Sequence, residues 1–240
     1  MEARELKVPW DPKGIVFDLD GLILDSERFY CRAWQEAARE LGYEITEEIY
    51  AQFVGIPNAE AERLLAGKWG PEFPVHEFSA RWHRCWENLL QRERIPSKPG
   101  FEEWIALLRA SAIPCAVATS SDRPDVLRAL GERAASFSAI VSRDQVRHGK
   151  PAPDLFLEAA CRLGLEPSTC LALEDSEAGL ESAFAAGMPV ILVPDMKPPS
   201  AAASQKAFLV ASSLHEVRQW WELNRLHAEG DSEANGARLP

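Results

Sequence analysis

The chain has 240 residues, of which 46% are hydrophobic and 26% are charged, which is typical of a globular α/β core with room for a small accessory domain. The net charge of −11 argues against nucleic acid or an anionic membrane surface as a partner, and no apolar run approaches the ~18 residues that a membrane helix needs. Five cysteines without a Cys-x-x-Cys pair indicate reduced thiols, with a zinc site as the weaker alternative, so we expect a cytoplasmic protein. We also expect a monomer.

The first predicted element is a buried strand at 14–17, an apolar run whose tip carries Asp18 and Asp20. Helical patterns and further apolar runs then alternate along the chain. The other strands are predicted at 115–119, 139–142, 170–173, 190–193 and 208–210, and helices at 101–110, 124–131, 154–163 and 176–186. This alternation predicts an α/β fold, a Rossmann-like parallel sheet that binds ligands beyond the carboxyl ends of its strands.

Residues 27–94 interrupt the alternation. They are rich in aromatic side chains and contain no convincing strand. We expect an inserted all-helical cap subdomain, with residues 95–100 as the return hinge. The catalytic core then consists of residues 1–26 and 95–222, and the small polar residues 229–240 predict a disordered tail.

Two carboxylates follow the first strand at positions i and i+2. Asp18 can attack phosphorus as a nucleophile, and Asp20 can give a proton to the leaving oxygen and later take one from water. A turn aspartate that caps backbone amides is the structural alternative. Calcium loops also contain Asp-x-Asp-Gly, so this motif alone is weak evidence of catalysis.

Two further segments suit a phosphate group. Thr119 and Ser120 follow the second strand, where a hydroxyl and backbone N–H groups can hold phosphate oxygens. Taken alone, an ordinary helix cap is the favoured interpretation of this segment. Lys150 stands between a glycine and a proline that restrict the backbone, and its ammonium can pair with phosphate and offset crowded carboxylates.

An acidic pair, Glu174 and Asp175, ends the fourth strand. Such a pair can complete a site for Mg²⁺, which prefers carboxylate, water and phosphate oxygens. The alternative is a helix start with acidic residues in its first turn, and both interpretations can hold together.

The order of these motifs along residues 14–194 resembles the haloacid dehalogenase-like hydrolase superfamily, and in particular its helical-cap branch of small-metabolite phosphatases and beta-phosphoglucomutase-like proteins. The resemblance implies that Asp18 is the nucleophile and Asp20 the general acid and base. It also implies that Thr119, the Ser120 amide and Lys150 bind the phosphate group.

The resemblance further implies a Mg²⁺ cofactor. Its ligands would come from Asp18, the Asp20 backbone carbonyl, Asp175 and, directly or through water, Glu174. The positive charge would offset the repulsion between an attacking carboxylate and an anionic phosphate.

The activity that the resemblance implies is a phosphatase of a small phosphorylated metabolite, such as a sugar phosphate, that forms a phospho-aspartate. A hexose-phosphate mutase is the alternative, although Tyr30 stands where those mutases carry a histidine, and neutral Asn58 stands where they carry a phosphate-gripping arginine. Dehalogenation is disfavoured because Asp20 is present. A non-catalytic binding protein on the same fold would lose site residues that this chain keeps.

Substrate specificity is expected to depend on residues at the mouth between cap and core. Motif spacing places four candidates there: Glu27, Asn58, Ser121 and Arg123. If these residues contact the leaving group, the core residues would hold only the transferring phosphoryl group. The sequence does not identify the natural substrate.

Overall fold

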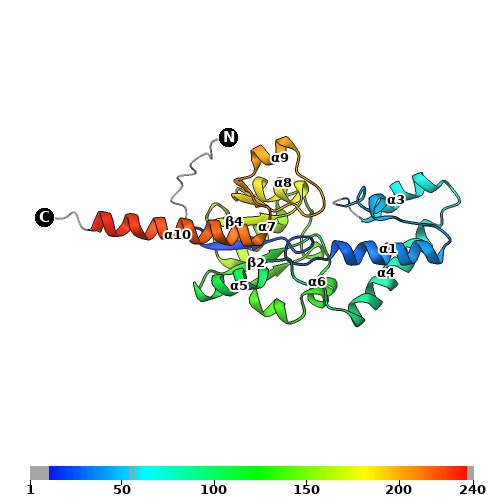
Figure 1. The fold of residues 1–240 in the computed structure, drawn as a ribbon, viewed down its shortest axis with the longest axis horizontal. Coiled ribbons are helices and arrows are strands. Elements are labelled where there is room, and N and C mark those ends of the chain that lie inside the picture. Colours follow the sequence, from blue (N-terminus) through cyan, green and yellow to red (C-terminus); the bar gives the residue numbers. More distant parts are fainter. Residues whose placement is uncertain (1–10, 55, 57, 237–240) are drawn as a thin grey trace.

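The computed structural model describes residues 11–54, 56 and 58–236 (Figure 1). Its centre is a six-stranded parallel sheet with the strand order β3-β2-β1-β4-β5-β6. The strands are β1 Gly14–Phe17, β2 Cys115–Ala118, β3 Ala139–Val141, β4 Cys170–Glu174, β5 Val190–Leu192 and β6 Leu209–Val210. All six predicted strands are therefore confirmed, with ends that differ by one residue at most.

Helices cover both faces of the sheet, because successive strand side chains point to opposite faces and both sets are apolar. On β1, Ile15 and Phe17 face one apolar cluster, and Val16 faces the other. The first cluster includes residues of α5 Phe101–Ala110, α6 Arg123–Leu130 and α10 Leu214–Gly236, and the second includes residues of α7 Asp154–Leu163, α8 Glu177–Ala185 and α9 Ala201–Lys206. The expected α/β class with a Rossmann-like core is confirmed.

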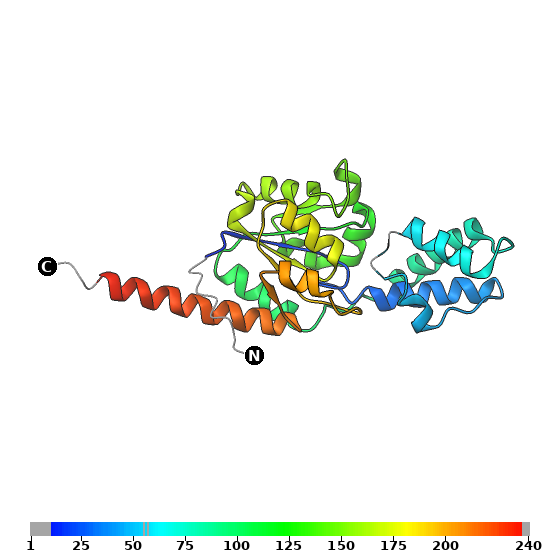
Figure 2. The same cartoon turned by 90° about the horizontal axis from the view of Figure 1, so that it is seen from above.

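In the described part of the chain, four helices lie between β1 and α5 and form a separate lobe at one end of the core (Figure 2). They are α1 Glu27–Glu40, α2 Glu47–Tyr50, α3 Asn58–Trp69 and α4 Val75–Arg92. Aromatic rings fill the lobe: Trp34 packs edge-on against Phe78 with ring centroids 5.3 Å apart. The expectation of a helical cap is confirmed, while its division from the core at residues 27 and 94 stays a prediction.

The two chain segments that join cap and core lie side by side. Leu24 bridges Ser97, the Asp25 amide donates to the Pro96 carbonyl at 2.9 Å, and the Lys98 amide donates to the Ile23 carbonyl at 2.8 Å. Both connections therefore leave the core beside the tip of β1, which carries Asp18.

The described part of the chain ends in α10. α10 continues through residues 229–236, where we expected a disordered tail, and residues 237–240 lie outside the described part. The expectation of a disordered tail at residues 229–240 stays a prediction. Figures 1 and 2 show α10 extending away from the cap.

Two further findings concern membrane-spanning helices and the cysteines. Across residues 11–54, 56 and 58–236, no helix combines the length and apolar character needed to cross a bilayer. The cysteines are all free, and four of them are buried, with Cys161 exposed on α7. This arrangement fits the interpretation of the buried four as core thiols.

Candidate active site

The predicted site residues gather where neighbouring strands end. β2, β1 and β4 are adjacent in the sheet, so Thr119, Asp18 and Asp175, each just beyond a strand, meet at one edge. The loop before α7 brings Lys150 to the same edge. Residues more than 130 positions apart in the sequence thus come into contact.

Lys150 lies between two buried carboxylates. Its Nζ donates to Asp18 Oδ1 and to Glu174 Oε1, the latter at 2.5 Å. The three side chains are 7%, 7% and 0% exposed, so water screens the pairs poorly. Burial would lower the pKa of Lys150, but the charges of Asp18 and Glu174 outweigh it and raise that pKa, which keeps the ammonium charged.

The Glu174 carboxylate is held by the start of α8. Its Oε2 accepts from the amide of Asp175 at 3.2 Å, from the amide of Ser176 at 3.3 Å and from the Ser176 hydroxyl at 3.1 Å. A carboxylate at a helix N-terminus is stabilised by these amides and by the helix dipole. Both oxygens of Glu174 are therefore occupied, which favours an indirect role towards a metal.

Three carboxylates form a cluster that fits a divalent cation. Single oxygens of Asp18, Glu174 and Asp175 lie within 4.8 Å of one another. Burial raises the pKa of Asp18 well above its usual range, Lys150 opposes the rise, and Glu174 and Asp20 add to it. Burial also raises the pKa of Asp175, together with the charges of Asp18 and Glu174. One ammonium does not balance this charge, so the donor set suits Mg²⁺.

The Asp20 side chain has partners of another kind. Its Oδ2 accepts from the Ser121 hydroxyl at 2.7 Å and, more weakly, from the Thr119 hydroxyl at 3.5 Å. Thr119 Oγ1 in turn accepts from the Ser121 amide at 3.1 Å. Ser120 is exposed between them at the tip of β2. The segment 119–121 therefore contacts Asp20 directly, which the sequence analysis did not foresee.

The structure places two of the four specificity candidates near Asp20. Ser121 contacts Asp20, and Glu27 lies close enough to Asp20 and Asp195 for their charges to raise its pKa. Glu27 also accepts from the Tyr50 hydroxyl at 2.8 Å. Burial is the largest cause that raises the pKa of Glu27, to about 7, and the Tyr50 hydrogen bond opposes it.

The other two candidates are placed differently. Arg123 donates from its guanidinium to the Ile140 carbonyl of β3 at 3.2 Å, and its amide donates to Asp144 at 3.0 Å. The Arg123 side chain is thus tied to the core beside β3. The structure describes the backbone of Asn58, at the start of α3, but its side chain lies outside the described part.

Two glycines belong to the site, and the sequence analysis gave neither of them a role. A Cβ at Gly179 would lie 1.9 Å from Glu174 Oε1, and a Cβ at Gly21, which has φ of +80°, would lie 2.4 Å from Asp175 Oδ2. Both glycines therefore leave space for an acidic side chain. The sequence did contain a signal for this role, because each glycine follows a strand-end carboxylate by at most five residues. Gly21 follows Asp18, and Gly179 follows Glu174.

An ion pair at the hinge was also missed. Lys98 Nζ donates to Asp195 Oδ1 at 2.5 Å and lies 3.7 Å from Asp25 Oδ1. Asp195 comes shortly after β5, and its Oδ2 would lie 3.4 Å from a Cβ at Gly21. Lys98 and Asp195 are 97 positions apart, so no local sequence pattern predicts that they form an ion pair.

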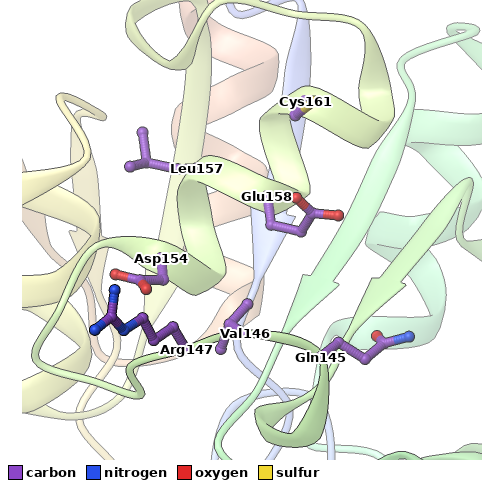
Figure 3. Close-up of a pocket in the computed structure, with 7 residues that line it drawn as sticks. All are labelled: Gln145, Val146, Arg147, Asp154, Leu157, Glu158 and Cys161. Atoms are coloured by element: carbon purple, nitrogen blue, oxygen red, sulfur yellow. The ribbon is translucent and has the colours of Figure 1, made fainter.

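A shallow pocket of about 410 Å³ lies elsewhere, beside α7 (Figure 3). Its lining consists of Gln145, Val146, Arg147, Asp154, Leu157, Glu158 and Cys161. It contains none of the predicted site residues, and Asp154 is already engaged by the amide and ring of His148 at 3.1 Å. We assign the site to the strand tips and not to this pocket.

The fold and the site define a class of protein that comparison with known families identifies. A model of the haloacid dehalogenase-like hydrolase family matches residues 15–193, which is well over half of the chain. The chain belongs to the haloacid dehalogenase-like hydrolases. The expectation of an enzyme, in place of a binding module, is confirmed by this membership.

Particular relatives are similar over most of their length. Hexitol phosphatase A of Escherichia coli is 36% identical over 184 residues, which cover 75% of this chain and 82% of that protein. Beta-phosphoglucomutase of Bacillus subtilis is 30% identical over 224 residues, which cover 89% and 97%. The crystal structure of a HAD family hydrolase from Deinococcus radiodurans with bound phosphate and sodium has a TM-score of 0.72 at 28% identity and covers 91% and 97%.

Proposed function

We propose that the protein is a Mg²⁺-dependent phosphoric monoester hydrolase that acts on a small phosphorylated metabolite, such as a sugar phosphate. The observation that carries this proposal is the buried Lys150 ammonium between Asp18 and Glu174, with a second strand-tip carboxylate, Asp20, two residues along. Relatives named as phosphatases, such as hexitol phosphatase A, support it. We further propose a cytoplasmic monomer without a nucleic acid or membrane partner, in line with its charge of −11.

In the first step, an oxygen of Asp18 forms a bond to phosphorus while the bond from phosphorus to the leaving oxygen breaks. The electron pair stays on the leaving oxygen, which takes a proton from Asp20. Lys150 pairs with the attacking carboxylate and with a phosphoryl oxygen. Thr119 and the Ser120 amide hold the remaining phosphoryl oxygens.

In the second step, water attacks the phosphorus of the phospho-aspartate and gives its proton to Asp20. The bond between phosphorus and Asp18 breaks, which restores the carboxylate and releases inorganic phosphate. Mg²⁺, held by Asp18, the Asp20 carbonyl and Asp175 with Glu174 nearby, would supply positive charge against the anionic phosphoryl group.

A hexose-phosphate mutase is the second candidate, and the similarity to beta-phosphoglucomutase over 89% of the chain favours it. A mutase must retain a bisphosphate in the site, which demands a second anion-binding group. The cap loop offers neutral Asn58 at the position expected to carry that group, so we rank hydrolysis above isomerisation.

One experiment tests the proposal. The protein is incubated with sugar phosphates, phosphoglycolate, nucleotides and an aryl phosphate, with Mg²⁺ or with a chelator, and products are followed by phosphorus NMR. We expect inorganic phosphate from at least one class, loss of turnover in chelator and recovery with Mg²⁺. Isomerisation of β-glucose 1-phosphate without phosphate release would instead support a mutase, and full turnover in chelator would contradict the metal dependence.

A further inference from the structure

Asp195, in the loop after β5, has one carboxylate oxygen with a partner and one without. Its Oδ1 accepts from Lys98 Nζ at 2.5 Å. Its Oδ2 is buried, and no group within residues 11–54, 56 and 58–236 forms a hydrogen bond to it. The whole side chain is only 12% exposed. A buried carboxylate oxygen is costly without a partner, so Oδ2 calls for one that the described chain does not provide, such as a water molecule or an ion.

This oxygen lies beside the acidic cluster of the site. A Cβ at Gly21 would lie 2.4 Å from Asp175 Oδ2 and 3.4 Å from Asp195 Oδ2. One point next to Gly21 is therefore close to both carboxylates, which reach it from two loops, one after β4 and one after β5. Only the backbone of a glycine lies there, so no side chain at position 21 fills the space between the two oxygens.

The positive groups nearby do not balance these carboxylates. Lys98 Nζ serves Asp195 and also Asp25, whose Oδ1 is 3.7 Å away. The acidic cluster likewise has a single ammonium, that of Lys150, between two of its carboxylates. Asp175 adds a further negative charge next to Asp195. The surroundings of Asp195 Oδ2 therefore favour a cation.

Asp195 is placed to act on such a cation indirectly. Oxygens of Asp18, Glu174 and Asp175 lie within 4.8 Å of one another. Asp195 does not belong to that cluster, which argues against direct ligation. Mg²⁺ uses few carboxylates and keeps several water molecules, whose hydrogens need acceptors. An acceptor next to Asp175 that has no other partner meets this need.

We propose that Asp195 belongs to the second coordination sphere of the Mg²⁺ site, where its Oδ2 accepts a hydrogen bond from the hydration water of the cation beside Asp175. Its Oδ1 stays on Lys98, in the return hinge. This inference rests on the metal dependence in the proposed function and adds a residue outside the motifs recognised in the sequence. Asp195 acts through water and not on the substrate, so it is a positioning residue.

The test measures cation affinity in the absence of substrate. Mn²⁺ prefers the same carboxylate and water oxygens as Mg²⁺, so it serves as the probe. It is titrated into each protein, and free Mn²⁺ is followed by electron paramagnetic resonance. Mg²⁺ is then added as a competitor. Circular dichroism in chelator checks the fold of each variant.

Two variants remove one carboxylate each from the same ammonium. Asp195→Asn keeps the size of the side chain and an oxygen for Lys98, but an amide replaces the acceptor at Oδ2. Asp25→Asn is the matched control. Both oxygens of Asp25 face cations, Lys98 at 3.7 Å and Arg28 at 3.3 Å, so neither is left to accept from water on a metal.

We expect Asp195→Asn to weaken the binding of Mn²⁺ and Mg²⁺ by ~10–100-fold, as is typical when a second-sphere partner of a metal site is lost. Asp25→Asn should bind both cations within about threefold of the wild type, because partly exposed charges are well screened. Turnover of Asp195→Asn should fall at low Mg²⁺ and recover most of the wild-type kcat at saturating Mg²⁺.

Three results would overturn the second-sphere role while leaving the phosphatase function intact. They are binding by Asp195→Asn within about threefold of the wild type, an equal loss in both variants, and a loss of kcat that saturating Mg²⁺ does not restore. If the wild type binds neither cation, the metal dependence of the proposed function fails first, and this inference fails with it. Should Asp195→Asn not fold, Asp195→Ser replaces it, since its shorter side chain also gives up the acceptor beside Gly21.

Discussion

Glu174 shows how one side chain can serve both the fold and the site. It is fully buried, yet Lys150 and three donors at the start of α8 satisfy its two oxygens. A buried carboxylate without such partners would cost several kcal/mol. Glu174 also accepts a hydrogen bond from Lys150. A displacement of the Glu174 carboxylate would therefore move the ammonium that faces Asp18.

Gly179→Ala tests that dependence. Its new methyl group would fall 1.9 Å from Glu174 Oε1, so the carboxylate must move, and we expect a loss of ~1–3 kcal/mol of stability together with lower turnover. Gly67→Ala in α3, whose methyl group would meet nothing within 4 Å, is the control and should raise stability by up to ~1 kcal/mol. Urea unfolding of both variants checks this. Equal stability of the two would contradict the assigned role of Gly179.

Glu27 predicts a dependence of stability on pH. Its pKa rises from the usual 4.5 to about 7 in the folded protein, so folding favours the protonated form. This contribution is fully present below about pH 4.5 and is lost as the pH rises through about 7, by up to ~3 kcal/mol. Glu27→Gln cannot titrate, and its amide oxygen still accepts from Tyr50.

The measurement is urea unfolding of the wild type and Glu27→Gln between pH 4 and 8. We expect the variant to gain stability over the wild type as the pH increases across that window. A constant difference between the two proteins would show that Glu27 does not titrate near neutral pH.

At the scale of elements, the local sequence pattern predicted the strands and the residues at their tips. Apolar runs that end in polar residues predicted β1 to β6, and placed Asp18 and Asp175 at one edge, because parallel strands bring their carboxyl ends together. Partners far apart in sequence could not be predicted. The pairs Lys98–Asp195 and Ser121–Asp20 depend on how loops meet in three dimensions, and no local period encodes them.

The specificity candidates show the same limit. Motif spacing predicts Arg123 at the cap mouth. In the structure its guanidinium donates to the carbonyl of Ile140, the partly buried middle residue of β3, which is an acceptor within reach, and its role in specificity stays a prediction. Spacing fixes where a backbone position lies, whereas the side chain direction depends on the partners within reach.

α3 begins at Asn58, and its role in substrate choice can be tested there. If cap residues contact the leaving group, as we expect, Asn58→Ala should change the ranking of substrates by kcat/KM across a chemically varied phosphate panel. Lys68→Ala, exposed near the other end of α3, should leave the ranking unchanged. A uniform decrease in Asn58→Ala, or no change, would argue that Asn58 does not contact substrates.

At the scale of the whole molecule, cap and core touch in more than one place. Besides the paired hinge segments, Lys197 in the loop after β5 donates to the Val54 carbonyl of the cap at 2.9 Å. We expect rotation about the hinge to open the site directly above Asp18, because both hinge segments leave the core beside the tip of β1.

The central claim is that Asp18 carries the phosphoryl group during turnover. The most direct measurement is an acid quench within a single turnover of a substrate labelled with radioactive phosphorus, followed by peptide mapping. We predict label on the peptide that contains Asp18, lost on mild alkaline treatment as expected of an acyl phosphate. In Asp18→Asn, which should keep its fold by circular dichroism, we predict no label and no turnover. Unlabelled protein during rapid phosphate release, or turnover of Asp18→Asn within tenfold of the wild type, would contradict the account.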